Sequence, residues 1–205
     1  MKKLIVVIVV ILVAGLLAYK FLWPKEEKKE GPKDQPLAIG RNTSAFNTAF
    51  GGVLEEYFAL KDALVEWDTV KADKAAYDLA LKADSLPIRS QLKADSNVVL
   101  TAVSLAASVS GEAKGLVGEG SIEQKRRGFN MLTDEIYNLI RTVRYDGEKI
   151  YHIKCPMAFN DSEEAFWLSS STDVINPYLG KHHPKYKATM VGCGEVSDSL
   201  DFTKK

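Results

Sequence analysis

Large apolar residues between positions 44 and 67 recur at alternating spacings of four and three residues. They are Phe46, Phe50, Val53, Tyr57, Leu60, Leu64 and Trp67. Because an α-helix has 3.6 residues per turn, this spacing places all of them on one face of a single helix. A helix with one apolar face must bury that face against another element, so the pattern predicts a helical protein with a packed core.

Three further segments carry helical patterns. A second helix is expected over 69–86 and ends at Pro87, and a third is expected over 96–110 with Gly111 past its end. A fourth opens with the capping-box sequence Ser121–Gln124. Four amphipathic helices with short connections predict a mainly α fold, an up-and-down four-helix bundle over residues 41–147.

Residues 148–205 lose the helical period. The stretch 149–153 alternates like a short strand, 165–168 is interpreted as a helical turn, and 176–180 has the composition of a turn. We expect a short irregular or β segment that packs on the bundle through its large aromatic side chains and forms one domain with it.

The amino terminus carries the composition of a membrane anchor. Leu4 to Trp23 is a run of 20 predominantly apolar residues, which as a helix would span about 30 Å, the thickness of one hydrocarbon core. Residues 1–23 are therefore predicted to be a signal anchor, and residues 24–40 a charged flexible linker. A cleaved secretory peptide is the alternative, since the small residue Ala18 ends the apolar run.

Either interpretation exports the rest of the chain. Lys2 and Lys3 favour a cytoplasmic amino end. The predicted location is thus the cytoplasmic (inner) membrane, crossed once through residues 4–23, with the domain facing the periplasm or the cell exterior.

Charge and motifs exclude several classes of function. The chain has 27 basic and 27 acidic residues and no formal net charge, which speaks against a nucleic-acid partner. It carries no P-loop, no zinc-protease motif, no nucleophile elbow and no dinucleotide fingerprint. We therefore predict that it is not an enzyme.

Residues with sulfur or imidazole side chains gather in the last third of the chain. They are His152, Cys155, Met157, His182, His183, Met190 and Cys193. Thiolate and thioether sulfurs are soft donors that favour Cu(I) or Ag(I), and imidazole accepts several metals. The pattern predicts a soft-metal site in which both cysteines and both methionines are ligands and the histidines are auxiliary.

Two other interpretations of the cysteines stay open. In an exported domain Cys155 and Cys193 can form a structural disulfide. Closing a loop of about 39 residues would add roughly 3–4 kcal/mol in the chain-entropy model. The cysteines can also be two unrelated buried thiols, and methionine often fills gaps in a core.

A set of short motifs resembles one bacterial family, domain-of-unknown-function family three-three-four-seven. The motifs are Cys155-Pro156-Met157-Ala158, Trp167-Leu168-Ser169, Asn176-Pro177-Tyr178-Leu179-Gly180, Met190-x-x-Cys193-Gly194-Glu195-Val196, Tyr57-x-x-Leu60-Lys61-Asp62-Ala63-Leu64 and Arg126-Arg127-x-Phe129. The resemblance covers about residues 45–200. It implies a helical envelope domain associated with heavy-metal efflux adaptors, with a copper or silver site at the Cys-Pro-Met and Met-x-x-Cys-Gly elements. Residues 181–189, which carry both adjacent histidines, intervene where the family usually runs directly to the methionine.

Overall fold

The computed structural model describes residues 42–203. The predicted membrane anchor at 4–23 and the linker at 24–40 lie outside these residues. Within the described part of the chain, no helix combines the length and apolar character needed to cross a membrane.

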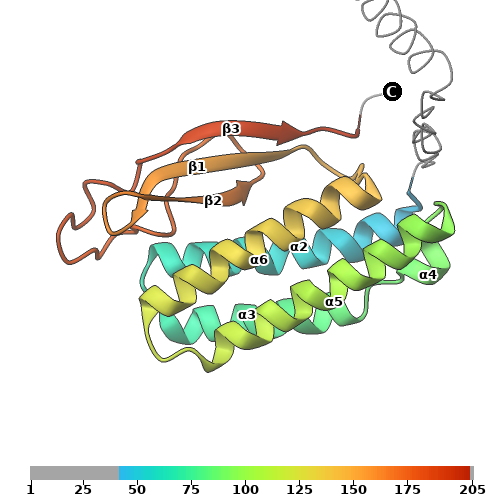
Figure 1. Cartoon of the computed structure of the whole chain (residues 1–205), viewed down its shortest axis with the longest axis horizontal. Coiled ribbons are helices and arrows are strands. Elements are labelled where there is room, and N and C mark those ends of the chain that lie inside the picture. Colours follow the sequence, from blue (N-terminus) through green and yellow to red (C-terminus); the bar gives the residue numbers. More distant parts are fainter. Residues whose placement is uncertain (1–41, 204–205) are drawn as a thin grey trace, which may run out of the picture. The chain divides into compact units, whose positions relative to one another are not determined.

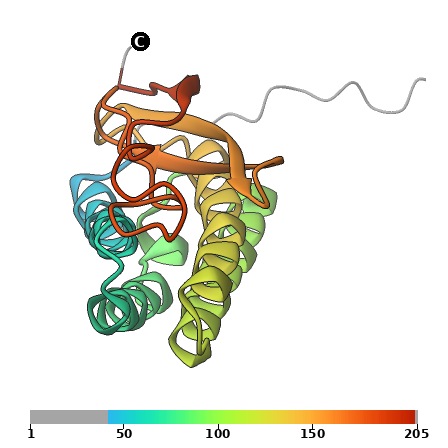
Figure 2. The ribbon, with the colours of Figure 1, turned by 90° about the vertical axis from the view of Figure 1, so that its left-hand side faces the viewer.

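Five helices make up most of the described chain. They are α2 (Ser44–Val65), α3 (Thr69–Asp84), α4 (Ile88–Gln91), α5 (Ser96–Gly118) and α6 (Ile122–Val143). The four long helices lie side by side, and each packs against the long helix that follows it in the chain (Figures 1 and 2). The predicted mainly helical character is confirmed.

Each long helix begins at a side chain that satisfies a free backbone N–H of the first turn. These N-cap residues are Thr43, Asp68, Asp95 and Ser121. At the predicted capping box, the Ser121 hydroxyl accepts a hydrogen bond from the Gln124 N–H at 3.2 Å and donates one to the Gln124 side-chain oxygen at 2.9 Å.

The third predicted helix was placed too short. α5 continues through Gly111 and Gly115 to Gly118. Ala113 and Leu116 stay buried beyond the first glycine, so the apolar face extends for two more turns. A glycine costs a helix about 1 kcal/mol relative to alanine, and the burial of this face offsets that cost.

Tyr57 joins the helices to the carboxyl-terminal segment. Its ring stacks on Phe129 of α6 with centroids 5.0 Å apart. Its hydroxyl lies 2.7 Å from the Thr133 hydroxyl and accepts a hydrogen bond from the Leu168 N–H at 3.0 Å. One fully buried side chain therefore connects three segments of the core.

The carboxyl-terminal segment forms a small antiparallel sheet. Its strands are β1 (Ile150–Phe159), β2 (Glu163–Ser169) and β3 (Glu195–Leu200), in the order β2-β1-β3. The sheet lies along one side of the helices, with β2 against α6 and α2 (Figures 1 and 2). The strand expected at 149–153 is present and longer than predicted.

The helical turn expected at 165–168 is wrong, because these residues lie in β2. Ala165 pairs with Cys155 and Trp167 pairs with Ile153 on β1. A short apolar run does not distinguish a strand from a buried helical turn, and here pairing with β1 decides.

Candidate metal centre

The structure brings the two cysteines together although 38 positions separate them in the chain. Their sulfur atoms lie 3.8 Å apart, and both are free thiols. Cys155 is completely buried, whereas Cys193 is partly exposed. The pair is thus a vicinal dithiol that can be reached from the Cys193 side.

The sheet fixes Cys155. β1 is the central strand, and Cys155 lies opposite Ala165 of β2. The next residue towards the amino end, Lys154, pairs on both sides, with Phe166 of β2 and Glu195 of β3. The main chain at this point therefore has little freedom to move.

Cys193 lies in the segment that connects β2 to β3, two residues before β3 begins. The Cys193 N–H donates to the Met190 carbonyl at 3.0 Å in a tight turn. Gly194 follows with φ at +144°, and a Cβ atom there would lie 2.8 Å from both the Lys154 carbonyl oxygen and the Trp167 ring. Only glycine fits this close approach, which presses the Cys193 turn against β1.

The environment of Cys193 favours its protonated thiol. Burial, together with the nearby Cys155, raises the pKa of Cys193 to about 11. At neutral pH the Cys193 thiol therefore keeps its proton, and a metal ion must displace that proton to bind.

The two predicted methionine ligands are close to the cysteines in the chain. Met157 follows Cys155 by two residues on β1, and Met190 supplies the carbonyl that holds the Cys193 turn. Both are partly buried and pack against the core. Met157 thus lies in the same chain segment as Cys155, and Met190 lies in the same segment as Cys193.

His152 lies apart from the thiols. Successive side chains of a strand point to opposite faces, so His152 and Cys155, three residues apart, lie on opposite faces of β1. The imidazole stacks between Tyr137 and Phe166, with centroids 4.4 and 4.7 Å away. Desolvation lowers its pKa, and the carboxylate of Asp198 partly opposes this shift.

The adjacent histidines lie in the connecting segment. His182 is exposed. His183 stacks on Tyr186 at 5.0 Å, and its Nδ1 accepts hydrogen bonds from the N–H groups of Lys185 and Tyr186, each at 3.2 Å. Nδ1 of His183 is therefore occupied, and Nε2 is the ring nitrogen that could bind a metal.

Within residues 42–203, no three side chains of the His, Cys, Asp and Glu types come together as a metal-binding group. Two thiolates alone complete the shell only of an ion in linear two-coordinate geometry. An ion of higher coordination number held by Cys155 and Cys193 would take further donors, and a thioether is a soft donor of this kind.

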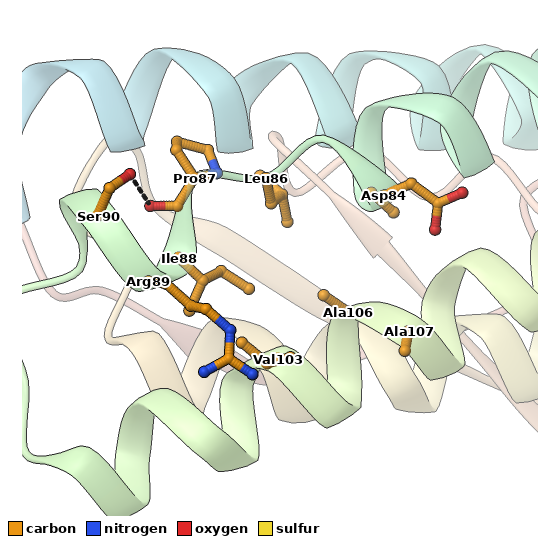
Figure 3. A pocket seen from close by; sticks show the side chains of 10 residues that line it. Asp84, Leu86, Pro87, Ile88, Arg89, Ser90, Val103, Ala106 and Ala107 are labelled. Atoms are coloured by element: carbon orange, nitrogen blue, oxygen red, sulfur yellow. Dashed lines mark hydrogen bonds between the residues drawn. The ribbon is translucent and has the colours of Figure 1, made fainter.

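A cavity of about 320 Å³ opens elsewhere, between α3, α4 and α5 (Figure 3). Leu86, Ile88 and Val103 form part of its apolar lining, with Arg89 and Asp84 also at its wall (Figure 3). None of the seven predicted ligands lines it. Sequence reasoning did not identify this cavity, because its walls come from the ordinary apolar faces of the helices.

Fold and geometry together define a mainly helical domain with a small sheet, and with a partly exposed pair of thiols at its central strand. The model of the family described as "Protein of unknown function (DUF3347)" matches residues 53–147. This is the family that the motifs resembled, and the match spans most of α2 and all of α3 to α6. The sheet with both cysteines lies beyond the matched segment. Neither a curated protein nor a solved structure matches the chain significantly.

Proposed function

We propose that this chain is a membrane-tethered envelope domain that binds a soft metal ion, Cu(I) or Ag(I), through Cys155 and Cys193. Met157 and Met190 are the proposed thioether ligands. The observation that supports this proposal best is the 3.8 Å separation of two sulfur atoms from distant parts of the chain.

The separation suits one ion held between two thiolates. With metal–sulfur bonds of about 2.3 Å, as in zinc thiolates, a sulfur–sulfur distance of 3.8 Å corresponds to an angle at the metal of about 110°. A linear two-coordinate ion would need sulfurs about 4.6 Å apart at the same bond length. The pair is therefore arranged for a bent site that takes one or two further ligands, the role we propose for the methionines.

The donor set favours a soft monovalent ion over zinc. Structural zinc is held by four nitrogen, thiolate or carboxylate donors, and no group of even three His, Cys, Asp or Glu side chains forms in the described residues. Two thiols supplemented by thioethers are the soft set that selects Cu(I) among the metals of proteins.

The cellular setting in this proposal comes from the sequence. Leu4 to Trp23 would hold the chain in the inner membrane, and the helices would form an up-and-down bundle on its outer side. A heavy-metal efflux adaptor, or another envelope protein, is the proposed partner in metal homeostasis or efflux. Metal binding and transfer need no catalytic group, in keeping with the predicted lack of enzymatic activity.

Titration of the reduced protein with Cu(I) in the presence of a competing chelator tests metal binding. The wild type is expected to bind one ion, and Cys155→Ser combined with Cys193→Ser is expected to lose at least 100-fold in affinity, since both thiolate ligands disappear. Unchanged affinity in this double variant would refute the proposal. Circular dichroism checks that the helices remain.

Methionine variants separate thioether ligands from core methionines. Met157→Leu and Met190→Leu are each expected to weaken Cu(I) binding about tenfold while keeping apolar volume. Met131→Leu is the matched control, because Met131 is 55% exposed on α6. If Met131→Leu weakened binding equally, the thioether assignment would fail.

The same 3.8 Å separation supports a second candidate function, a structural or partner-binding domain with a Cys155–Cys193 disulfide. Counting thiols on protein isolated from the envelope distinguishes the two. Two thiols that become available only after reduction favour the disulfide, and two free thiols favour the metal site.

A further inference from the structure

We propose that Asn176 is the positioning residue that holds Cys193 at metal-binding distance from Cys155. This inference rests on the proposed soft-metal function and assigns a role to one residue of the Asn176–Gly180 turn. In the sequence, Asn176 belongs to a turn and to one of the motifs that resemble the family, without a role of its own.

Of the two cysteines, Cys193 is the one whose position needs support. Cys155 lies in the middle of the sheet, whereas Cys193 precedes β3 in the connection between β2 and β3. A Cβ atom at the neighbouring Gly192 would meet nothing within 4 Å, so the turn is not closely packed at that position. On the other side Gly194 packs closely against β1, and a hydrogen bond from a third segment adds to that contact.

Asn176 makes that contact. Its side-chain amide nitrogen donates to the Cys193 carbonyl at 2.7 Å, and its backbone N–H donates to the Val191 carbonyl at 2.7 Å. The side chain is completely buried, where an unmade hydrogen bond is costly. Two hydrogen bonds from one residue, to Cys193 and to Val191, thus hold the Cys193 turn.

The oxygen of the Asn176 side-chain amide is also hydrogen-bonded. Its Oδ1 accepts hydrogen bonds from the N–H groups of Tyr178 and Leu179 at 2.8 and 2.9 Å. This Asx-type turn fixes which end of the amide faces Cys193. The nitrogen must point to the Cys193 carbonyl, because the oxygen is already used.

The turn that carries Asn176 is tied to the rigid part of the molecule. Arg126 of α6 donates through Nε to the Pro177 carbonyl at 2.8 Å. The Tyr178 hydroxyl donates to the Phe166 carbonyl of β2, and the Gly180 N–H donates to the Asn176 carbonyl at 3.0 Å. Through these hydrogen bonds Asn176 holds Cys193 at a fixed position relative to α6 and β2.

Two substitutions remove the donor and keep the turn. In Asn176→Asp the carboxylate still accepts from Tyr178 and Leu179 but repels the Cys193 carbonyl. In Asn176→Ser the hydroxyl can maintain a similar turn but is too short to reach Cys193. Both variants should let the Cys193 turn move away from β1.

The primary measurement needs no metal. The reduced protein is equilibrated with glutathione and glutathione disulfide. The two thiols give up two electrons and two protons, and one glutathione disulfide becomes two glutathione molecules. The equilibrium constant gives the effective concentration of one thiol at the other. Both variants are expected to lower it about five- to tenfold, the size expected for one buried hydrogen bond. A change below twofold in both would overturn the proposal.

Asn130→Asp is the matched control. Asn130 also accepts through Oδ1, from the Phe166 N–H at 2.9 Å, but has no hydrogen bond to the Cys193 turn. Asn130→Asp should leave the thiol equilibrium within twofold of wild type. If Asn130→Asp lowered the equilibrium constant as much as the Asn176 variants do, the change would reflect a general loosening of the structure, and the specific role of Asn176 would be refuted. Should both Asn176 variants fail to fold, hydrogen exchange of the wild-type Asn176 side-chain amide decides. Slow exchange supports the proposal, and exchange at the rate of a free amide refutes it.

Cu(I) titration of the same variants separates this inference from the proposed function. If wild type binds Cu(I), the Asn176 variants should lose affinity by a similar factor. If wild type binds no Cu(I) but the thiol equilibrium still depends on Asn176, the metal proposal fails and the positioning role stands.

Discussion

Gly194 packs so closely on the strand that carries Cys155 that a Cβ atom would lie 2.8 Å from the Lys154 carbonyl oxygen. Its φ of +144° is also one that glycine alone adopts readily. Both constraints act one residue after Cys193. The main chain at Gly194 therefore determines how near the second thiol can come to the first.

Gly194→Ala is expected to separate the thiols. The strained backbone alone costs about 1–3 kcal/mol, and the contact with the backbone of Lys154 cannot be relieved by a side-chain movement. We expect Cu(I) affinity to fall at least tenfold in the chelator titration. Gly192→Ala is the control on the other side of Cys193, where a Cβ atom meets open space, and equal losses in the two variants would contradict this account.

The sequence predicted correctly those features of the fold that depend on residues close together in the chain. The Ser121 cap and the apolar faces of the long helices follow from spacings of three and four, which act within one helix. The end of α5 was misplaced because Gly111 is a strong local signal, while the burial of Leu116 that overrides it is tertiary. The 165–168 segment was misassigned for the same reason, since pairing with β1 determines its conformation.

The sequence predicted which residue types form the candidate site, but it predicted only part of their arrangement in space. Sulfur chemistry singled out Cys155 and Cys193, and these two meet. His152 was included because it lies three residues from Cys155, but strand alternation puts these side chains on opposite faces. Once 149–153 is taken as a strand that reaches Cys155, that separation follows. The contact from Asn176 to Cys193 depends on long-range packing that no local pattern records.

Arg126 is expected to be essential for the carboxyl-terminal segment. Its guanidinium is buried, lies 4.2 Å from the centroid of the Trp67 ring, and donates to the carbonyls of Leu64 and Pro177 at 3.1 and 2.8 Å. Arg126→Met leaves two buried carbonyls without this donor, so we expect a loss of about 2–4 kcal/mol in the free energy of unfolding.

Urea denaturation measures this loss, and the adjacent arginine provides the comparison. Arg127 is partly exposed, pairs with Glu163 at 3.1 Å and lies 4.2 Å from the centroid of the Phe159 ring, contacts worth about 0–1 kcal/mol each at such a site. Arg127→Met should therefore change stability little. Similar losses for the two variants would show that burial of Arg126 does not matter.

Gly111→Ala is expected to stabilise the domain by about 0.5–1 kcal/mol, because alanine is the better helix former and a Cβ atom there meets open space. Gly128→Ala in α6 is the counterpart, since its Cβ atom would lie 3.1 Å from Leu116. Thermal unfolding should rank Gly111→Ala above wild type and Gly128→Ala below Gly111→Ala. If Gly128→Ala were more stable than Gly111→Ala, the assignment of Gly111 to an exposed face of α5 would be contradicted.

His152 should make folding sensitive to mild acid. Burial between Tyr137 and Phe166 holds the pKa of His152 below its ordinary value of 6.5. The unfolded chain then binds more protons than the folded one below about pH 6.5, so the free energy of unfolding falls as the pH drops through this range. The contribution is fully present above the unfolded-state pKa.

Urea denaturation at pH 7 and pH 5 of wild type and His152→Phe tests this dependence. Phenylalanine keeps the ring between its neighbours but does not titrate, so the variant should lose less stability than wild type. The pKa of His183 is shifted in the same direction, but His183 is present in both proteins and cancels in the comparison. Equal pH dependence would contradict the prediction for His152.

Metal binding should release the proton of Cys193. Burial and the nearby Cys155 raise the pKa of Cys193 to about 11, so this thiol is protonated at pH 6–8. A metal ion that takes the thiolate must displace that proton, and this group alone should raise apparent affinity about tenfold per pH unit. Calorimetric titration with Ag(I) in two buffers of different ionisation enthalpy measures the released protons directly. Wild type should release at least one proton at pH 7, and Cys193→Ser should release at least one fewer. Silver binding to wild type without proton release would show that Cys193 is not a ligand.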